Sequence, residues 1–326
     1  MPAASAAVIP PAPMSSIHAV IRAQPSPEIH PAIRAVCDDL RTRFGDSIEA
    51  VLYYGSCLRQ GDPTDGVIDL YVIVSDYRAA WPTWGRRLIA RFLPPTVGYL
   101  ETPWDEGCIR TKYAVISQRD FRRGTSGRWF HSYLWARFSQ PCVLLETRDD
   151  EVSAALTDSL ATAVVTLLDR SVPLAPSRID AVALWSLALG ASYRAELRPE
   201  SSGRAESLVA DNAAYYAELT RAYADGAGRR WLSAVEASGD YVVSMPPWRH
   251  RRGRMAWFFR RLAGKFLSTF RWFKAAVTFE GGIDYAVWKL ERHTGVKIEV
   301  TEKLRKRPWL YAWGEIIRLY RSGTLR

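Results

Sequence analysis

The stretch from residue 49 to residue 76 constrains the fold of this 326-residue chain more than any other part. It contains two short apolar runs, 51–54 and 67–74, separated by a Gly-Ser pair and an irregular polar segment. Such near-continuous apolar runs are typical of β-strands that are covered on both faces. One carboxylate, Asp69, interrupts the second run. Because an unpaired acid inside a buried strand is costly, Asp69 requires a hydrogen bond, an ion pair or a metal ion.

Gly55 and Ser56, with Asp69 in the following strand, have the outline of a nucleotidyltransferase site. A glycine lets the backbone approach a triphosphate closely, and a serine hydroxyl with neighbouring N–H groups binds its oxygens. The acid can hold Mg²⁺ against the same phosphates. The usual pattern has two acids, Asp-x-Asp, and here Tyr71 occupies the second position. A hairpin-like turn with Asp69 capping a neighbouring loop is the alternative, and the spacing leaves both interpretations open.

The composition indicates an anionic partner and gives no sign of a structural metal. The net charge of +10 favours nucleic acid, a phosphorylated substrate or an anionic membrane surface. The four cysteines are scattered without a CxxC pair, so we expect reduced thiols in a cytosolic protein. The sequence has no run of about twenty apolar residues, so we expect no membrane-spanning helix.

The chain divides by character into four expected regions. Residues 1–27 are rich in Ala and Pro and are expected to be a disordered tail. Residues 28–150 are expected to form a nucleotidyltransferase-like domain with a mixed sheet, including a helix over 129–140. Residues 151–247 predict a helical domain with helices over 152–168, 180–197 and 207–223. Residues 248–326 predict a basic amphipathic, membrane-proximal region. The expected fold class is therefore α+β.

The segment 248–273 predicts an amphipathic helix that is both basic and aromatic. Its apolar residues recur every three or four positions: Met255, Phe258, Phe259, Leu262, Phe266, Phe270 and Phe273. Its cations include Arg254, Arg260, Arg261, Lys265 and Arg271. An interface with anionic lipid selects this combination. A core helix whose apolar stripe packs against the helical domain is the alternative, and the sequence leaves both open.

Four blocks of sequence together carry a family resemblance. They are YGS with VIDLYVIVSD (54–56 and 67–76), IRTKYAVIS with Arg137 and QPCVLL, SYRAELR (192–198) with Arg204, and KAAVTFEGGIDYAVWKLERH (274–293). In this order and spacing they resemble the mitochondrial translocator assembly and maintenance type of phosphatidate cytidylyltransferase and its bacterial relatives. Glu196 departs from the family, which more often has Asp there, and residues beyond 295 find no clear match.

The resemblance implies that CTP and phosphatidate react to give CDP-diacylglycerol and pyrophosphate, with Mg²⁺ as the cofactor. It also implies a peripheral membrane protein, here on the cytoplasmic face of the inner membrane. We expect Gly55 and Ser56 to bind the triphosphate and Asp69 to hold Mg²⁺. Lys112 is expected to neutralise the charge that develops on the α-phosphate and the pyrophosphate.

The remaining candidate site residues concern the second metal ligand and the lipid headgroup. A second ligand for Mg²⁺ is expected from Asp65 or Glu101. The phosphate of phosphatidate is expected to lie on Arg198 and Arg204, with Glu196 nearby. An internal ion pair within a helix is the alternative role for Glu196 and Arg198.

Two other classes of function remain open at this stage. The first is a nucleotidyltransferase with a non-lipid acceptor such as RNA, a small alcohol or a protein. Nucleic acid is not expected as a partner, because the aromatic residues mostly follow a helical stripe and do not form a stacking platform. The second is a non-catalytic membrane-surface protein with a decayed nucleotide fold, which the absence of the second Asp supports. The oligomeric state is not predicted.

Overall fold

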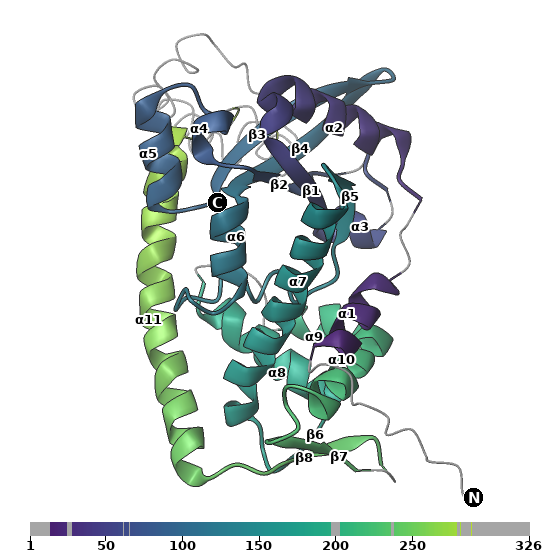
Figure 1. The fold of residues 1–326 in the computed structure, drawn as a ribbon, viewed down its shortest axis with the longest axis vertical. Coiled ribbons are helices and arrows are strands. Elements are labelled where there is room, and N and C mark those ends of the chain that lie inside the picture. Colours follow the sequence, from purple (N-terminus) through teal and green to yellow (C-terminus); the bar gives the residue numbers. More distant parts are fainter. Residues whose placement is uncertain are drawn as a thin grey trace, which may run out of the picture.

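A five-stranded mixed sheet lies at one end of the molecule, in the strand order β3-β4-β2-β1-β5 (Figure 1). The computed structural model describes residues 14–24, 28–60, 62–64, 66–196, 203–235, 238–278, 281 and 288. The strands are β1 (Ile48–Tyr54), β2 (Ile68–Val74), β3 (Thr96–Trp104), β4 (Gly107–Ser117) and β5 (Val143–Thr147). The β2–β4 pair is parallel and the other pairs are antiparallel. The α+β class and the mixed sheet are confirmed.

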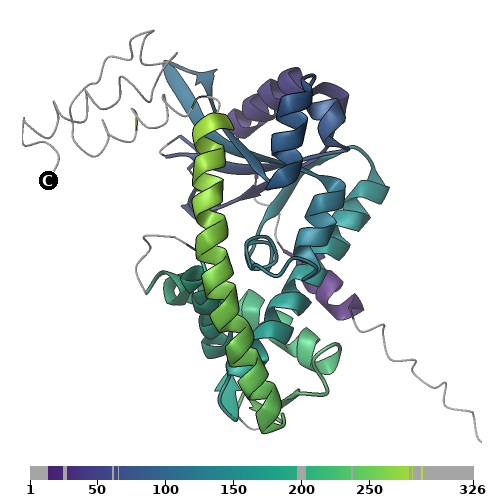
Figure 2. The same ribbon diagram turned by 90° about the vertical axis from the view of Figure 1, so that its left-hand side faces the viewer.

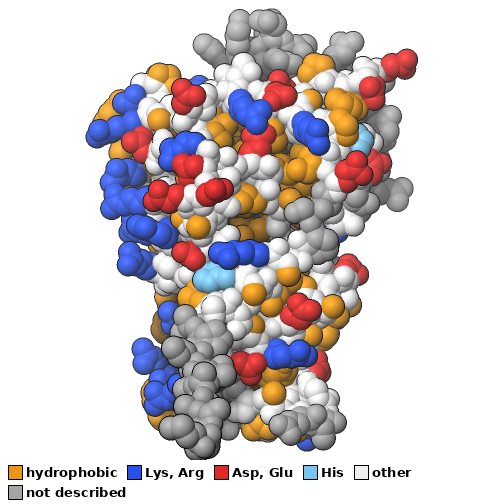
Figure 3. Space-filling model, turned by 45° about the vertical axis from the view of Figure 1, so that its right-hand side comes forward, with side chains coloured by type: hydrophobic (Ala, Val, Ile, Leu, Met, Phe, Trp, Pro, Cys, Tyr) orange, Lys and Arg blue, Asp and Glu red, His pale blue; other side chains and the backbone are white. Residues whose placement is uncertain are grey.

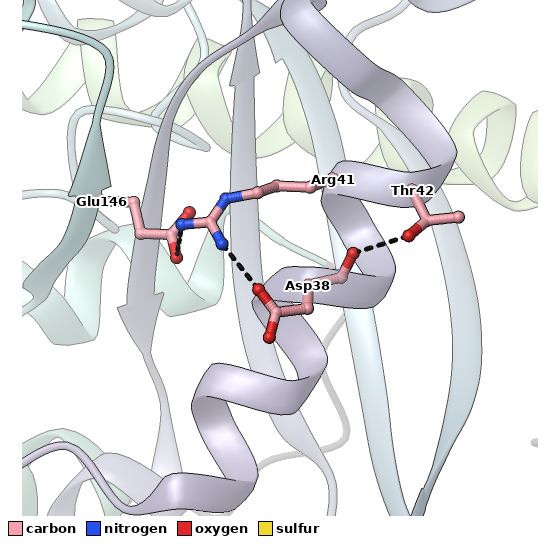
Figure 4. A network of polar contacts seen from close by, with 4 residues as sticks. All are labelled: Asp38, Arg41, Thr42 and Glu146. Carbon is pink, nitrogen blue, oxygen red and sulfur yellow. Dashed lines mark hydrogen bonds and ion pairs between the residues drawn. The ribbon is translucent and has the colours of Figure 1, made fainter.

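Helices α2 (Pro31–Phe44), α4 (Tyr77–Ala80) and α5 (Trp84–Phe92) cover one face of this sheet. Proline at the first position of α2 suits the helix start, where an N–H has no intrahelical partner. Arg41 joins α2 to β5 through Glu146 (2.7 Å), and within α2 it also bonds Asp38 (2.6 Å) (Figure 4). This face carries its own buried cluster, which includes Val36 and Leu70.

The opposite face of the sheet packs on a second core that continues into the helical part of the chain. Here lie α6 (Gln118–Thr125), α7 (Asp150–Ser171), α8 (Ala181–Arg194), α9 (Arg204–Ala210) and α10 (Ala213–Asp225). Buried residues of the sheet, such as Tyr71 and Ile116, belong to the same cluster as Leu184 of α8 and Tyr216 of α10. The site-bearing face of the sheet is therefore held by the helical part.

The expected disordered tail is wrong for part of its length. Helix α1 (Ser15–Arg22) packs near α7 and α10, with Ile17 fully buried. His18 Nε2 lies 2.9 Å from Asp158 Oδ1 of α7. Apolar residues at helical spacing, Ile17 with Val20 and Ile21, outweigh the Ala/Pro-rich composition of the flanking sequence.

Two further predictions of secondary structure are wrong, and one small sheet was not predicted. Residues 126–140, called the turn segment below, form successive turns and not a helix. The predicted helix 207–223 is divided into α9 and α10. The additional sheet has the order β6-β8-β7 and consists of β6 (Arg178–Asp180), β7 (Leu232–Ala234) and β8 (Asp240–Val243). Strands this short carry too few residues to show a period-2 pattern.

One described helix is long and apolar enough to cross a bilayer, judged by length and composition alone. It is α7 with the adjoining turn η2 (Val172–Leu174), residues 150–174, and 56% of its most apolar window is buried inside the protein. Its buried residues belong to the core described above. The same values are typical of a core helix in a folded domain.

Helix α11 (Pro247–Thr278) runs along the molecule from the small sheet to the large one (Figures 1 and 2). Its packed face is narrow and carries Gly253, Trp257, Arg260, Gly264 and Ser268. A Cβ atom at position 264 would lie 2.0 Å from the carbonyl oxygen of Ala195, so only glycine permits this approach. Trp257 Nε1 donates to Arg170 O (2.8 Å).

The apolar side chains of α11 face outward. The exposed stripe, as we call it, consists of Met255, Phe258, Phe259, Leu262, Phe266 and Phe270, each 44–65% exposed. The alternative of a core helix that buries this stripe is therefore wrong for these six residues, because glycine and polar positions make the contact with the protein. The side chain of Phe273 lies outside the described residues.

Candidate functional site

Gly55 and Ser56 form the bend that follows β1, on the side of the sheet that packs on the helical part. Gly55 has φ +99°, a conformation that L-residues rarely adopt, and Ser56 is the first residue of the short helix α3 (Ser56–Gln60). Arg59 of α3 donates back to Gly55 O (3.1 Å). The sharp bend predicted from the Gly-Ser pair is present, and the short helix α3 forms the first part of the segment expected to be irregular.

Asp69 points at this bend. A Cβ atom at position 55 would lie 2.8 Å from Asp69 Oδ2, so the carboxylate rests directly against the glycine backbone. The register explains the approach, because Asp69 pairs with Tyr54 in the antiparallel β1–β2 ladder. The structure thus brings Asp69 against Gly55, and Ser56 follows as the first residue of α3.

Lys112 stands beside Asp69 on the same face of the sheet. The two residues are partners in the parallel β2–β4 ladder, and Lys112 in turn pairs with Tyr99 of β3. Partners in neighbouring strands project to the same face. One row across the sheet therefore contains Tyr99, Lys112, Asp69 and Tyr54. This row lies on the same face of the sheet as the buried Tyr71. A cation next to the acid and the bend is suited to bind phosphate oxygens.

Cys57, the residue after Ser56, has a structural role. Its Sγ donates to Val67 O (3.2 Å), and the side chain is buried. Burial, with a further contribution from Asp69, raises the pKa of the Cys57 thiol. A thiol with a raised pKa is a poor nucleophile at neutral pH.

Glu101, predicted as one possible second metal ligand, is not brought to Asp69. It lies on β3, two strands away from β2, which places its Cα about 10 Å or more from that of Asp69. Glu101 instead accepts from Tyr99 Oη (2.7 Å) and lies 3.6 Å from Arg110 Nε. Distance and these two contacts separate it from the Gly-Ser bend.

Three other candidates fall wholly or partly outside the described residues. Asp65 and Arg198 are outside, as is the side chain of Arg204, whose backbone begins α9. Glu196 is described and follows the end of α8, where its N–H bonds Tyr193 O (3.0 Å). Its charge acts on Arg137 and Tyr133, so it faces the sheet side of the helical part.

The described residues offer a magnesium ion one carboxylate at this bend. Within these residues no three His, Cys, Asp or Glu side chains gather as a metal cluster. Mg²⁺ is commonly bound through one or two carboxylates together with substrate phosphates and water. Asp69 is a carboxylate of that kind, and it fits an ion that brings its remaining ligands with a nucleotide.

Aromatic and basic groups from the turn segment face the row on the sheet. Arg137 Cζ lies 5.1 Å from the centre of the Tyr54 ring and 5.0 Å from that of Tyr133. Burial opposes the charge of Arg137, but Tyr54, Tyr133, Tyr71 and Glu196 together raise its pKa above the usual value. Arg137 is therefore held as a cation beside the bend.

Helix α11 adds a cation that the sequence did not assign to the site. Arg271 Cζ lies 4.1 Å from the centre of the Tyr133 ring. The sequence groups Arg271 with the cations of the amphipathic helix, and the structure places it on the packed side with Gly264 and Ser268. The spacing 264, 268, 271 follows one helical face, so the signal was available once the packed face was known.

Tyr133 lies at the meeting point of three cations. Burial alone would raise its pKa, but Arg137, Arg271 and Lys112 outweigh burial and hold the pKa of Tyr133 below its usual value. The sequence offered no signal for Tyr133, since an isolated tyrosine in an aromatic segment has no distinguishing pattern. The site therefore combines an acid at a glycine bend with a cluster of positive charge.

Comparisons with known proteins add little to this geometry. No model of a known protein family matches the chain, and no curated protein matches it. Among solved structures, a nucleotidyltransferase-like protein from Exiguobacterium sibiricum is similar over 60% of this chain and 76% of its own, with 10% identity and a TM-score of 0.28. A similarity this low carries no argument, so the inference rests on the residues of this chain.

Proposed function

We propose that this chain is a nucleotidyltransferase that transfers a cytidylyl group from CTP to phosphatidate at a membrane surface. One observation carries the proposal. The Asp69 carboxylate lies against the positive-φ Gly55, and Lys112 is its neighbour in the adjoining strand. An acid, a close-approach glycine and a cation in one place are what a bound nucleoside triphosphate requires.

The reaction joins two phosphate groups. An oxygen of the acceptor's phosphate monoester attacks the α-phosphorus of the nucleotide. The bond between the α-phosphorus and the oxygen that bridges it to the β-phosphorus breaks, which releases pyrophosphate. The attacking monoester is already largely ionised at neutral pH, so the site needs no strong general base. Positioning and charge stabilisation then supply most of the rate.

Each residue of the site has a role in this reaction. Gly55 gives the triphosphate access to the backbone, and Ser56 supplies a hydroxyl donor. Lys112 neutralises charge on the transferring phosphate and on the leaving group. Asp69 would hold Mg²⁺, which supplies Lewis-acid stabilisation of the phosphate oxygens when bound.

The outward face of α11 supports a lipid acceptor. Its exposed stripe lies beside solvent-facing cations such as Arg254, Arg261 and Lys265. Large apolar groups exposed in a row mark an interaction surface, and flanking cations favour anionic lipid. Figure 3 shows Lys and Arg side chains gathered along the left-hand edge of one face. The choice of CTP and phosphatidate rests on the family resemblance.

Helix α5 carries a second row of exposed apolar side chains. Trp84, Leu88 and Phe92 are four residues apart, on one side of the helix, and are 52–79% exposed. Lys274 Nζ near the end of α11 bonds Leu93 O (2.8 Å) directly after α5, so these two helix ends are adjacent (Figure 1). Two neighbouring helices therefore present aromatic side chains to the surroundings.

One observation favours a second candidate, a non-catalytic membrane-surface protein. Tyr71 takes the place of the second acid and is fully buried, so it cannot bind a metal ion from that position. This candidate binds the membrane through the same helices and lacks turnover.

Substitution of Asp69 separates the two candidates. Purified protein is incubated with phosphatidate liposomes and each of four labelled nucleoside triphosphates, and the lipid products are resolved by thin-layer chromatography. We expect CDP-diacylglycerol from CTP, and a fall of about 100-fold or more in Asp69→Asn, because the site loses the charge that holds the metal and phosphates.

The control is Asp46→Asn, which removes a carboxylate from the exposed turn η1 (Gly45–Ser47). It should retain full turnover. Turnover in Asp69→Asn equal to that of the control would remove Asp69 from its role. Absence of any nucleotide transfer by the unaltered protein would favour the non-catalytic candidate.

A further inference from the structure

Two arginines from distant parts of the chain meet on one tyrosine ring. Arg137 comes from the turn segment and Arg271 from α11, and their Cζ atoms lie 5.0 and 4.1 Å from the centre of the Tyr133 ring. Such contacts with an aromatic ring hold each guanidinium in place but use none of its N–H donors.

Several of these donors are buried without a hydrogen-bond partner. They are Nε of Arg137 and both Nε and Nη2 of Arg271, counted among the described residues. A buried, unsatisfied donor carries the full desolvation cost of the group, more so when the group is charged. A folded protein that maintains three such donors in one place has a reason beyond packing.

The charge of the surroundings adds to this cost. Lys112 and both arginines lower the pKa of Tyr133 by their positive charge, and the negative charge of Glu196 opposes them. Like charges that share a partly buried site repel one another unless an anion joins them. Guanidinium groups bind phosphate through paired N–H donors, so a phosphate dianion is the chemical partner that suits these unpaired donors.

We propose that Arg137 and Arg271 form a subsite that binds the phosphate monoester of the acceptor. This inference rests on the proposed function and extends it by placing the second substrate. The subsite adjoins the nucleotide side, because Arg137 contacts the ring of Tyr54, the residue before Gly55 and the partner of Asp69. An acceptor phosphate held there is next to the bend that receives the triphosphate.

The test is binding of a soluble, short-chain phosphatidate to the full chain without nucleotide, measured by calorimetry. In Arg271→Met we expect the dissociation constant to rise about tenfold or more, because charged hydrogen bonds to the phosphate are lost. Arg271→Lys keeps the charge without the paired donors, so its dissociation constant should lie between those of the unaltered protein and Arg271→Met. The affinity for Mg²⁺-CTP, titrated separately, should not change.

Stability gives a second, independent readout. Because Arg271→Met removes buried donors that have no partner, its melting temperature in the absence of ligand should equal or exceed that of the unaltered protein. The matched control is Arg34→Met, which removes a positive charge from the exposed side of α2. It should leave both affinities unchanged.

The outcomes are distinct. Unchanged affinity for phosphatidate in Arg271→Met overturns the subsite. An equal loss of affinity for Mg²⁺-CTP also overturns it, because the arginines would then serve the nucleotide. A lowered melting temperature together with an equal loss of both affinities does so too, because Arg271 would then support the fold and not the acceptor. Arg271-dependent binding of phosphatidate without any CTP turnover would retain the subsite and refute the proposed reaction.

Discussion

At the scale of single residues, the contact between Gly55 and Asp69 links backbone conformation to the proposed chemistry. Gly55 has φ +99°, and the Asp69 carboxylate occupies the space where a side chain at position 55 would lie. The glycine is therefore required twice, once for the bend and once for the position of the acid.

Gly55→Ala should damage the site more than the fold. The unfavourable φ costs about 1–2 kcal/mol, and the added Cβ would lie 2.8 Å from Asp69 Oδ2, so the acid must move. We expect weaker binding of Mg²⁺-CTP, measured by calorimetry, and a modest loss in denaturant unfolding. Gly45→Ala is the control, because Gly45 also has positive φ (+54°) but has no atom within 4 Å of the added Cβ. Equal nucleotide affinity in both variants would contradict the assigned role of Gly55.

The sequence could predict Asp69 but not Arg271. An acid in an apolar strand after a Gly-Ser pair is a local pattern, and strand alternation fixes the face on which it lies. Arg271 reaches Tyr133 only because α11 packs along the protein with a particular side inward. Which side packs inward depends on contacts between residues far apart in the chain, and hydrophobic periodicity carries no information about such contacts. The sequence also does not show that Glu101 lies two strands from Asp69, because strand order is set by contacts between distant segments.

At the scale of secondary-structure elements, α11 shows how far hydrophobic periodicity can be trusted. The pattern predicted a helix and two faces, and the described helix includes the whole predicted stretch. It did not determine which face packs, because the inward face uses glycines at 253 and 264 for close approach. Burial by close backbone contact leaves no apolar signal in the sequence.

The junction of α11 with the end of α5 should be sensitive to pH. Lys274 Nζ donates to Leu93 O (2.8 Å) and Pro95 O (3.2 Å), while burial and Arg271 lower its pKa to about 7. The folded state then binds fewer protons than the unfolded chain between pH 7 and the unfolded pKa of 10.5. The contribution of Lys274 to the free energy of unfolding therefore rises with pH across this window and is constant below it.

Denaturant unfolding at pH 7 and pH 9 tests this expectation. The unaltered protein should gain stability relative to Lys274→Met as the pH rises, whereas its difference from Lys265→Met, on the exposed side of α11, should stay constant. Parallel behaviour of all three proteins would show that Lys274 keeps an ordinary pKa.

At the scale of the whole molecule, a continuous core and an outward apolar surface occur together. The core extends from the sheet through α7 to α10, so the sheet and the helical part pack as neighbours. Outside it, α5 and α11 leave large aromatic residues exposed on a chain of net charge +10. Apolar contact and positive charge act together at an anionic membrane surface.

Vesicle binding tests this surface without disturbing the core. Leu262 and Phe266 are 54% and 65% exposed, so the double variant Leu262→Ser/Phe266→Ser should fold normally. We expect its affinity for phosphatidylcholine vesicles that contain phosphatidylglycerol to fall about tenfold or more, because less apolar area enters the bilayer. Co-sedimentation with the vesicles measures this affinity. Val182→Ser, at an exposed position on α8, should bind as the unaltered protein does. Equal binding by the double variant would refute the membrane role of α11.

The location of Arg271 on the last described helix has a consequence for the newly made chain. The ribosome synthesises the Gly-Ser bend about 200 residues before this arginine, which at usual elongation rates is about 10–40 s earlier. The nascent protein can thus present a nucleotide-type bend well before the second cation arrives on α11. The proposed joining of two substrates would therefore be possible only after translation has delivered that helix.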